Sequence, residues 1–267
     1  MLCDSHAHLL DERLRDRAEE IVANLEREGL AFVVEISAGI DESHRAFAFA
    51  DKHEKVFCTL GVHPHYSGEY SERGEEYENW VREVSSNKKV VAMGECGLDY
   101  HYPTRPSDSC QRVAFVGQIK LAHELGLPLV IHSRDAFDDT FAILKEYKEF
   151  LKSGVLMHCY SYGADEVRKV SAAFDAYFSF SGAFTYAKKS IDVEAVKEAM
   201  KAVPKDRLIL ETDCPYLAPV PVRGTVNEPK NVHYIAKAMG EILGIGFDEV
   251  AKLTLENTKR FYGIGVA

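Results

Sequence analysis

The stretch Val90-Val91-Ala92-Met93-Gly94-Glu95 shows the pattern that decides the fold: a short apolar run, bounded by a glycine, that leads into an acid. Similar runs recur along the chain, and polar clusters and helix-like segments separate them. The other runs are Leu2-Cys3, Phe32–Val34, Val56–Leu60, Leu129–Ile131, Val155–Met157, Tyr177–Phe180 and Leu208–Leu210. Runs this short and this apolar are typical of buried parallel strands.

Segments with helical spacing of apolar residues lie between these runs. They are Arg13–Arg27, Ala114–Leu125, Thr140–Leu151 and Asp192–Val203. Two further helices are expected between Pro229 and Tyr262, separated by Gly244-Ile245-Gly246. Eight strands that alternate with helices favour a (β/α)8 TIM-like barrel over an open sheet. We therefore predict one metal-dependent hydrolase domain over residues 1–267, an α/β barrel with extra C-terminal helices.

Composition excludes several classes of protein. Hydrophobic residues make up 46% of the chain and charged residues 28%, which is typical of a folded enzyme. The net charge of −10 argues against a protein that grips duplex DNA with a basic face. We find neither an apolar run of membrane-spanning length nor a signal peptide, and the six cysteines form no CxxC pair. These features predict a cytoplasmic protein without a membrane segment, and they leave its oligomeric state open.

The strongest signal is where the polar residues fall. Six of the apolar runs lead into a histidine or an acid: His6 and His8, His63 and His65, Glu95, His132, His158, and Glu211 with Asp213. The carboxyl ends of barrel strands meet on one face, where barrel enzymes keep their active sites. The pattern therefore predicts that these side chains share one pocket.

Imidazoles with carboxylates indicate a site for divalent metal ions. His6 and His8 are two residues apart, so an extended strand points both rings the same way. A single histidine is more often structural, and we expect that role for the remaining ones: His44, His53, His101, His123 and His233. Strand alternation predicts that Cys96, Cys159 and Cys214 point away from the pocket as inert packing groups.

Several segments, in this order, resemble the TatD family of metal-dependent deoxyribonucleases, within the amidohydrolase-like barrels. They are Asp4-Ser5-His6-Ala7-His8, Gly61-Val62-His63-Pro64-His65, Gly94–Tyr100, His132-Ser133-Arg134, His158-Cys159-Tyr160, Glu211–Tyr216 and Arg223–Pro229. The resemblance runs from Asp4 to about Tyr262.

The resemblance implies a role for each matching residue. His6, His8 and Asp213 would hold one metal ion, His132 and His158 a second, and Glu95 would bridge the two. His63 would contact the substrate phosphate. Asp99, Arg134 and Arg223 would either contact phosphate or support the metal ligands, and structural salt bridges at the barrel mouth are an equally open alternative for each. Glu211 would accept a hydrogen bond from a metal-bound histidine. The implied cofactors are two divalent ions, drawn from Mg, Mn, Zn or Co.

The implied reaction is cleavage of phosphodiester bonds in DNA, as a 3′-end exonuclease on single-stranded or frayed ends. A metal-activated water would attack phosphorus, with Asp213 as proton acceptor and Glu95 and His63 also in catalytic positions. Tyrosines near the rim are candidates for stacking on bases or for simple packing: Tyr66, Tyr100, Tyr102, Tyr160 and Tyr216. Two alternatives stay open, an amidohydrolase of a C–N or lactone bond and a non-catalytic, metal-holding binder of nucleic acid or protein.

Overall fold

The computed structural model describes residues 1–186 and 192–265, and its strands form an eight-stranded sheet. The strands are β1 (Leu2–Ala7), β2 (Leu30–Ile36), β3 (Val56–Leu60), β4 (Val90–Asp99), β5 (Leu129–Arg134), β6 (Val155–Met157), β7 (Ala176–Phe180) and β8 (Leu208–Leu210). Their order in the sheet is their order in the sequence, and the pairs β1–β2, β3–β4, β4–β5, β5–β6 and β7–β8 run parallel.

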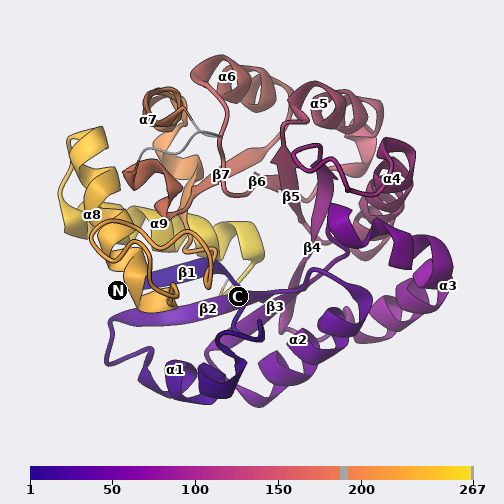
Figure 1. Cartoon of the computed structure of the whole chain (residues 1–267), viewed down its shortest axis with the longest axis horizontal. Coiled ribbons are helices and arrows are strands. Elements are labelled where there is room, and N and C mark those ends of the chain that lie inside the picture. Colours follow the sequence, from indigo (N-terminus) through magenta and orange to yellow (C-terminus); the bar gives the residue numbers. More distant parts are fainter. Residues whose placement is uncertain (187–191, 266–267) are drawn as a thin grey trace. The chain divides into compact units, whose positions relative to one another are not determined.

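Helices alternate with these strands along the chain (Figure 1). They are α1 (Ala18–Asn24), α2 (Ile40–Lys52), α3 (Ser67–Val84), α4 (Asp108–Leu125), α5 (Phe137–Glu146), α6 (Ala164–Ala173), α7 (Val193–Ala202), α8 (Val232–Leu243) and α9 (Phe247–Tyr262). Short 3-10 helices cover Arg15–Arg17, Pro64–Tyr66, Lys148–Phe150, Gly182–Thr185, Lys205–Arg207 and Pro229–Asn231. Parallel strands in sequence order with alternating helices confirm the predicted (β/α)8 class, and α8 and α9 confirm the predicted C-terminal helices.

The chain divides into two compact units. The first unit comprises Met1–Glu35, Cys159–Ala172 and Tyr177–Ala267, and the second comprises Ile36–His158 and Ala173–Ala176. The prediction of one domain over the whole chain stays a prediction.

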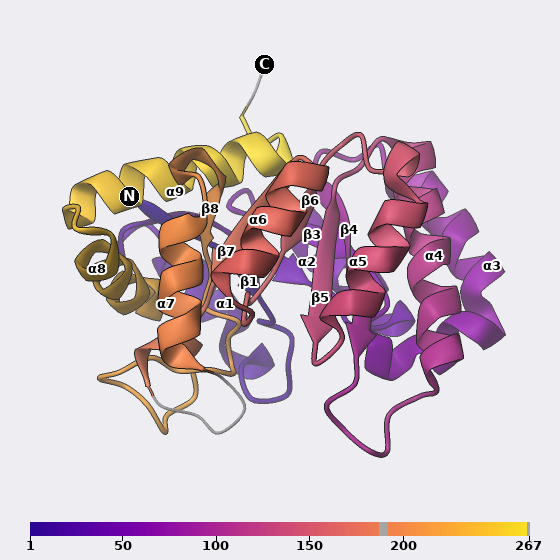
Figure 2. The same ribbon diagram turned by 90° about the horizontal axis from the view of Figure 1, so that it is seen from above.

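In the first unit, the segment that follows β8 forms hydrogen bonds with the end of β1. The Asp213 amide donates to the His6 carbonyl at 2.9 Å, and the His8 amide donates to the Cys214 carbonyl at 2.8 Å. Helix α9 packs beside β1 and β8, and its Tyr262 hydroxyl donates to the Ser5 carbonyl at 3.0 Å. Figure 2 shows α8 and α9 lying next to each other in this unit. These bonds fix two segments that are about two hundred residues apart in sequence.

In the second unit α2, α3, α4 and α5 flank strands β3, β4 and β5 (Figure 1). Strand β4 is buried along its whole length. Phe115 of α4 is fully buried, which stabilises such a side chain by roughly 1.5–3 kcal/mol relative to water. Ser107 begins α4 by accepting a hydrogen bond from the Cys110 amide, and Gly126 ends it in the left-handed conformation.

Two glycines let β4 lie unusually close to β5. Gly94 and Gly97 have φ values of +133° and +144°. A Cβ at Gly94 would meet the Val130 carbonyl oxygen at 2.5 Å, and a Cβ at Gly97 would overlap the carbonyl oxygen of His132. The positive φ values and the close backbone contacts both require glycine at these two positions. The sequence prediction ended this strand at Met93, because glycine normally weakens a strand, whereas here the close approach carries it on to Asp99.

The first predicted helix is also different in the structure. The expected helix over Arg13–Arg27 is a 3-10 turn at Arg15–Arg17 followed by α1 over Ala18–Asn24. The Asp11 carboxylate accepts a hydrogen bond from the Arg13 amide at 2.9 Å. Such a local side-chain bond competes with helix formation, so the chain turns before α1 begins.

Among the described residues, no helix is both long enough and apolar enough to cross a membrane.

Candidate metal centre

Three side chains at the carboxyl ends of β1 and β8 converge in the first unit: His6, His8 and Asp213, here called the first ligand set. Their candidate ligand atoms lie within 4.8 Å of one another. The Asp213 Oδ1 atom is 3.8 Å from His6 Nε2 and 3.5 Å from His8 Nε2. Asp213 has a φ of +56°, so its backbone occupies a left-handed conformation that is uncommon for a residue with a side chain.

Asp4 holds the segment that precedes Asp213. Its buried carboxylate accepts hydrogen bonds from the Thr212 amide at 2.8 Å and from the Thr212 hydroxyl. Burial raises the pKa of Asp4 to about 8, against the opposing effect of these hydrogen bonds. Asp4 therefore ties β1 to the turn after β8.

Asn227 holds the same turn from its other side. Its amide nitrogen donates to the Thr212 carbonyl at 3.0 Å and to the Tyr216 carbonyl at 2.7 Å. Its side-chain oxygen accepts from the Asn231 amide group at 2.9 Å. Asn227 is fully buried, so the late Asn-Glu-Pro segment acts here as a clamp on the Asp213 turn.

Glu211 lies behind the first ligand set. Its Oε1 accepts from the Cys159 amide at 2.7 Å, and its Oε2 accepts from the Ser179 hydroxyl at 2.5 Å. The same Oε2 lies 4.0 Å from His6 Nδ1, the ring nitrogen on the opposite side from Asp213. A carboxylate on this side of a histidine ring favours the proton on Nδ1, but 4.0 Å is longer than a hydrogen bond, so the role of Glu211 as acceptor stays a prediction.

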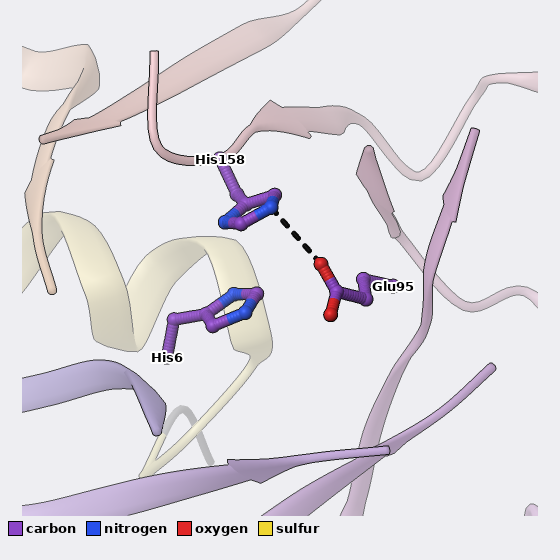
Figure 3. A group of neighbouring side chains, drawn as sticks. All are labelled: His6, Glu95 and His158. Carbon is purple, nitrogen blue, oxygen red and sulfur yellow. Dashed lines mark ion pairs between the residues drawn. The ribbon is translucent and has the colours of Figure 1, made fainter. Parts of the chain in front are cut away.

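The second ligand set, Glu95, His132 and His158, lies in the second unit. Its closest atoms are Glu95 Oε2, His132 Nδ1 and His158 Nε2. The separations are 3.0 Å between Glu95 and His158, 3.6 Å between Glu95 and His132, and 3.2 Å between the two histidines. Figure 3 shows His158 Nε2 directed at the Glu95 carboxylate and also draws the His6 side chain of the first ligand set.

Asp99 contacts the other side of the His132 ring. Its Oδ2 lies 3.1 Å from His132 Nε2 and also 3.1 Å from His65 Nε2. Gln111 of α4 fixes the Asp99 backbone, because it accepts from the Asp99 amide at 2.8 Å and donates to the Asp99 carbonyl at 3.1 Å. Asp99 is only 1% exposed, so of its two expected roles the structure favours support of His132 over contact with substrate phosphate.

His63 lies beside the second ligand set, with its ring centroid 4.3 Å from that of His132. Its Nδ1 accepts a hydrogen bond from the His65 amide at 3.1 Å, which leaves the ring proton on Nε2. Burial and the nearby His132 hold the pKa of His63 well below its ordinary value. Burial alone would raise the pKa of Glu95, but the surrounding histidines outweigh it and hold that pKa well below its ordinary value.

The two expected arginine contacts are outside both ligand sets. Arg134 follows His132 on β5, and its guanidinium lies over the Tyr102 ring at 5.2 Å. Arg223 is exposed and lies 4.3 Å from the centroid of the Tyr186 ring. Both cations remain at the surface of their own unit.

The donor atoms fit metal ions. Two ligands bound about 2.1 Å from one tetrahedral ion are themselves roughly 3.4 Å apart. The separations in both ligand sets, 3.0–3.8 Å, are close to that value. Imidazole with carboxylate suits Zn and Mn, whereas Mg prefers a higher share of oxygen ligands. Within the described residues, a further group of His63, Asp99 and His132 could also hold an ion, although both ring nitrogens of His132 already face other partners.

Two of the three cysteines that are predicted to be packing groups are buried, and the third is only partly buried. Cys96 and Cys214 are fully buried, and burial raises the pKa of both thiols. Cys159 is only partly buried, and its sulfur lies 3.1 Å from the Ser181 hydroxyl. Strand alternation does not apply to it, because β6 ends at Met157 and Cys159 occupies a turn with a φ of +44°.

Three functional residues were not assigned a role from the sequence. His65 repeats the two-residue spacing of His6 and His8, and that repeat could have identified it. Asp4 precedes His6 within one motif, but nothing in the sequence shows that it reaches Thr212. Asn227 lies in the Arg223–Pro229 segment of the family resemblance, but its contact with the Asp213 turn depends on folding.

Comparison with known proteins agrees with this geometry. The family model described as "TatD related DNase" matches residues 3–263. A Bacillus subtilis protein named "Uncharacterized metal-dependent hydrolase YabD" is 38% identical over 99% of this chain and 100% of its own length. A Cronobacter sakazakii protein named "3'-5' ssDNA/RNA exonuclease TatD" is 31% identical over 85% of this chain and 84% of its own length.

Solved structures show the same fold. The crystal structure of YjjV, a TatD homologue from Escherichia coli, superimposes with a TM-score of 0.86 at 24% identity and covers 98% of both chains. An uncharacterized amidohydrolase from Saccharomyces cerevisiae superimposes with a TM-score of 0.84 at 17% identity, covering 98% of this chain and 99% of its own.

Proposed function

Because the chain belongs to the family of TatD related DNases, we propose that it hydrolyses phosphodiester bonds at the 3′ ends of single-stranded or frayed DNA. The chain is a metal-dependent hydrolase, as are the relatives that match its full length. The observation that carries the proposal is the pair of ligand sets, each of which gathers imidazole and carboxylate atoms at the separations that one ion requires.

We assign one divalent ion to each ligand set. His6, His8 and Asp213 would hold the first, and Glu95, His132 and His158 the second, with Glu95 also predicted from the family resemblance to bridge them. Mg, Mn, Zn and Co are the candidate ions. When bound, such ions polarise a phosphoryl oxygen and make water acidic enough to supply a nucleophile near neutral pH.

Side chains of the protein would accept the proton of the attacking water and would bind the substrate phosphates. The Asp213 side chain is 15% exposed, so it can accept a proton from a water molecule at the mouth of the site. His63 carries its ring proton on Nε2 and can donate a hydrogen bond from there to a phosphate oxygen. Arg134 and Arg223 can bind flanking phosphates of a nucleic-acid strand.

A single-stranded substrate is consistent with the charge of the chain. A protein of net charge −10 repels the phosphate backbone at long range, so attraction must be local. Bound ions, His63 and the two arginines would supply it. A duplex presents far more phosphates than these groups can neutralise, whereas a single end presents few. Cytoplasmic location stays a prediction.

The test compares substrates and metals. The protein is stripped with EDTA, reconstituted separately with Mg, Mn, Zn or Co, and offered a 5′-labelled single-stranded oligonucleotide, its duplex, and a panel of lactones and dihydropyrimidines. We expect metal-dependent shortening of the single strand from its 3′ end, and about a thousandfold loss of rate in Glu95→Ala and His132→Ala, a loss typical when a group that stabilises the transition state is removed.

His123→Ala is the matched control, because His123 is an exposed histidine of α4 in the same unit. It should retain the wild-type rate. Turnover of a lactone or dihydropyrimidine without oligonucleotide cleavage would replace the proposal with the amidohydrolase alternative. Oligonucleotide binding without cleavage, under every metal, would instead indicate a non-catalytic binder.

A further inference from the structure

We propose that Tyr216 binds the base of a nucleotide whose phosphate lies at the ion that the first ligand set would hold. This inference rests on the proposed function, because it assumes that a nucleotide is the ligand. It goes further by assigning a base-binding surface and by predicting that the site distinguishes a nucleotide from the same sugar phosphate without its base.

The position of Tyr216 supports this role. Tyr216 lies three residues after Asp213 of the first ligand set. Its ring centroid is 6.1 Å from that of His8, at an interplanar angle of 84°. Tyr216 is 46% exposed, whereas most aromatic side chains of the unit are buried. An exposed aromatic ring next to a metal ligand provides an apolar flat surface beside a charged site, the combination that a nucleotide requires.

The ring is also held rigidly. The Arg13 guanidinium lies 4.1 Å from the ring centroid and covers one face. Arg13 is fixed by two hydrogen bonds to the Asp11 carboxylate, at 2.9 and 3.0 Å. The Tyr216 hydroxyl donates to the same carboxylate at 3.1 Å. A ring fixed in this way loses little conformational entropy when a second flat group stacks on it.

Asp11, Arg13 and Tyr216 form a cluster in which Arg13 is already paired with a carboxylate, which disfavours Arg13 as a phosphate-binding residue. The Nε and Nη2 edge of Arg13, the edge that binds a carboxylate or phosphate through two parallel hydrogen bonds, is bonded to Asp11. The guanidinium instead acts on the Tyr216 ring through a cation–π contact, which stabilises its orientation. The cluster therefore supplies a positioned π surface beside the first ligand set.

The other rim tyrosines are less suited to this role. Tyr160 is 5% exposed and donates to the Gly163 carbonyl, and Tyr100 donates to the Asp139 carboxylate. Tyr102 is 45% exposed, but its arginine, Arg134, lies farther from the ring, at 5.2 Å. Among these four tyrosines, Tyr216 combines exposure, fixed orientation and contact with a metal ligand.

Calorimetry on the metal-loaded protein tests the inference directly. The probes are 2′-deoxyadenosine 5′-monophosphate and 2-deoxyribose 5-phosphate, which differ only in the base. We expect the wild type to bind the nucleotide about tenfold more tightly, as one base–aromatic stack allows. Tyr216→Ala should lower nucleotide affinity to that of the sugar phosphate without changing the affinity for the sugar phosphate itself. Tyr216→Phe should keep the preference.

Two further variants sharpen the test. Arg13→Gln removes the cation–π contact and the two Arg13 bonds to Asp11, keeps the Tyr216 hydroxyl bond to Asp11, and should reduce the preference about threefold. Tyr234→Ala removes an exposed tyrosine of α8 in the same unit and should behave as wild type. A base preference that survives in Tyr216→Ala, or is absent from the wild type, would overturn the inference.

The outcomes separate this inference from the proposed function. If the wild type cleaves oligonucleotides but binds both probes equally, the nuclease proposal stands and the base-binding role of Tyr216 fails. If no metal supports cleavage but Tyr216→Ala removes a measured base preference, the base-binding surface stands and the nuclease proposal fails.

Discussion

The Nε2 atom of His132 lies 3.1 Å from Oδ2 of Asp99, while Nδ1 of the same ring faces Glu95 and His158. A histidine bound to metal through one nitrogen commonly donates its other ring proton to a carboxylate, which fixes the tautomer and the ring angle. Asp99 is therefore placed to control how His132 presents Nδ1 to an ion.

Substitution of Asp99 tests this control. We expect Asp99→Asn to weaken metal binding by the second ligand set about 10- to 100-fold, the usual effect of losing such a partner. Calorimetric titration of the apo-protein with Zn or Mn measures the affinity. Asp138→Asn, which neutralises an exposed acid of α5 in the same unit, is the control. Unchanged affinity in Asp99→Asn would mean that Gln111 and strand packing alone orient His132.

From the two separate ligand sets we predict how many metal ions each variant retains. Each set has its own three side chains, so His8→Ala and His158→Ala should each lower the bound metal by about one ion per chain. Elemental analysis after exhaustive dialysis measures the content, with His44→Ala, a histidine stacked on Trp80, as control. Complete loss of metal in either variant would indicate one shared site.

The hydrogen bonds of Asn227 predict that its replacement lowers the free energy of unfolding. Replacement by alanine removes the donors to the Thr212 and Tyr216 carbonyls and the acceptor for Asn231. Unpaired buried polar groups cost about 1–3 kcal/mol each, so we expect Asn227→Ala to lower the free energy of unfolding by about 2–4 kcal/mol. Urea unfolding measures this, and Asn231→Ala, which removes one of these bonds, should have a smaller effect. Equal losses in the two variants would contradict the proposed clamp.

Lys89 should affect stability without affecting metal binding. Its ammonium group donates to the carbonyls of His53, Glu54 and Val56 at 2.5, 2.8 and 3.0 Å, before and at the start of β3. A hydrogen bond to a charged group contributes about 1.5–3 kcal/mol, so Lys89→Met should destabilise the protein by at least that amount. Thermal unfolding and metal titration of the same sample would show a lower Tm and an unchanged metal affinity. Lys88→Met is the neighbouring control.

The cluster around Tyr216 predicts how base recognition varies with pH. The hydrogen bond from Arg13 lowers the pKa of Asp11 to about 2, and burial together with Asp11 raises the pKa of Tyr216 to about 12. An acid whose pKa is lowered by folding contributes its stabilisation above its unfolded pKa and loses it as the pH falls toward the folded value. Asp11 thus stays charged and Tyr216 neutral from about pH 5 to 9.

The preference for nucleotide over sugar phosphate should therefore be constant across that range, because titration of the phosphate changes the affinity of both probes alike. Calorimetry of both probes at several pH values gives the ratio. A preference that changes severalfold between these limits would show that another group controls the ring.

The sequence predicted most of what depends on short-range pattern. The three runs Val56–Leu60, Val155–Met157 and Leu208–Leu210 are strands with the predicted bounds, because apolar composition and flanking polar residues define them locally. The length of β4 could not be predicted, since it depends on backbone contact with β5 across its glycines.

For the candidate site, residue type and place at a strand end were enough to nominate both ligand sets. What the sequence could not provide was the direction of each ring. The roles of Asp4, Asp99 and Asn227 depend on which carbonyl or nitrogen each side chain reaches, over separations of up to about two hundred residues. Such contacts follow from tertiary packing and leave no periodic trace in the sequence.

The glycines of β4 bear on how mutational data for this protein should be interpreted. In a saturation screen scored by activity, positions 94 and 97 would be as intolerant as Glu95, because any side chain there collides with the backbone of β5. Neither glycine has a side chain that could bind an ion or a substrate. A ranking by intolerance alone would place them among the reactive residues, and only a parallel screen for abundance would identify them as requirements of backbone spacing.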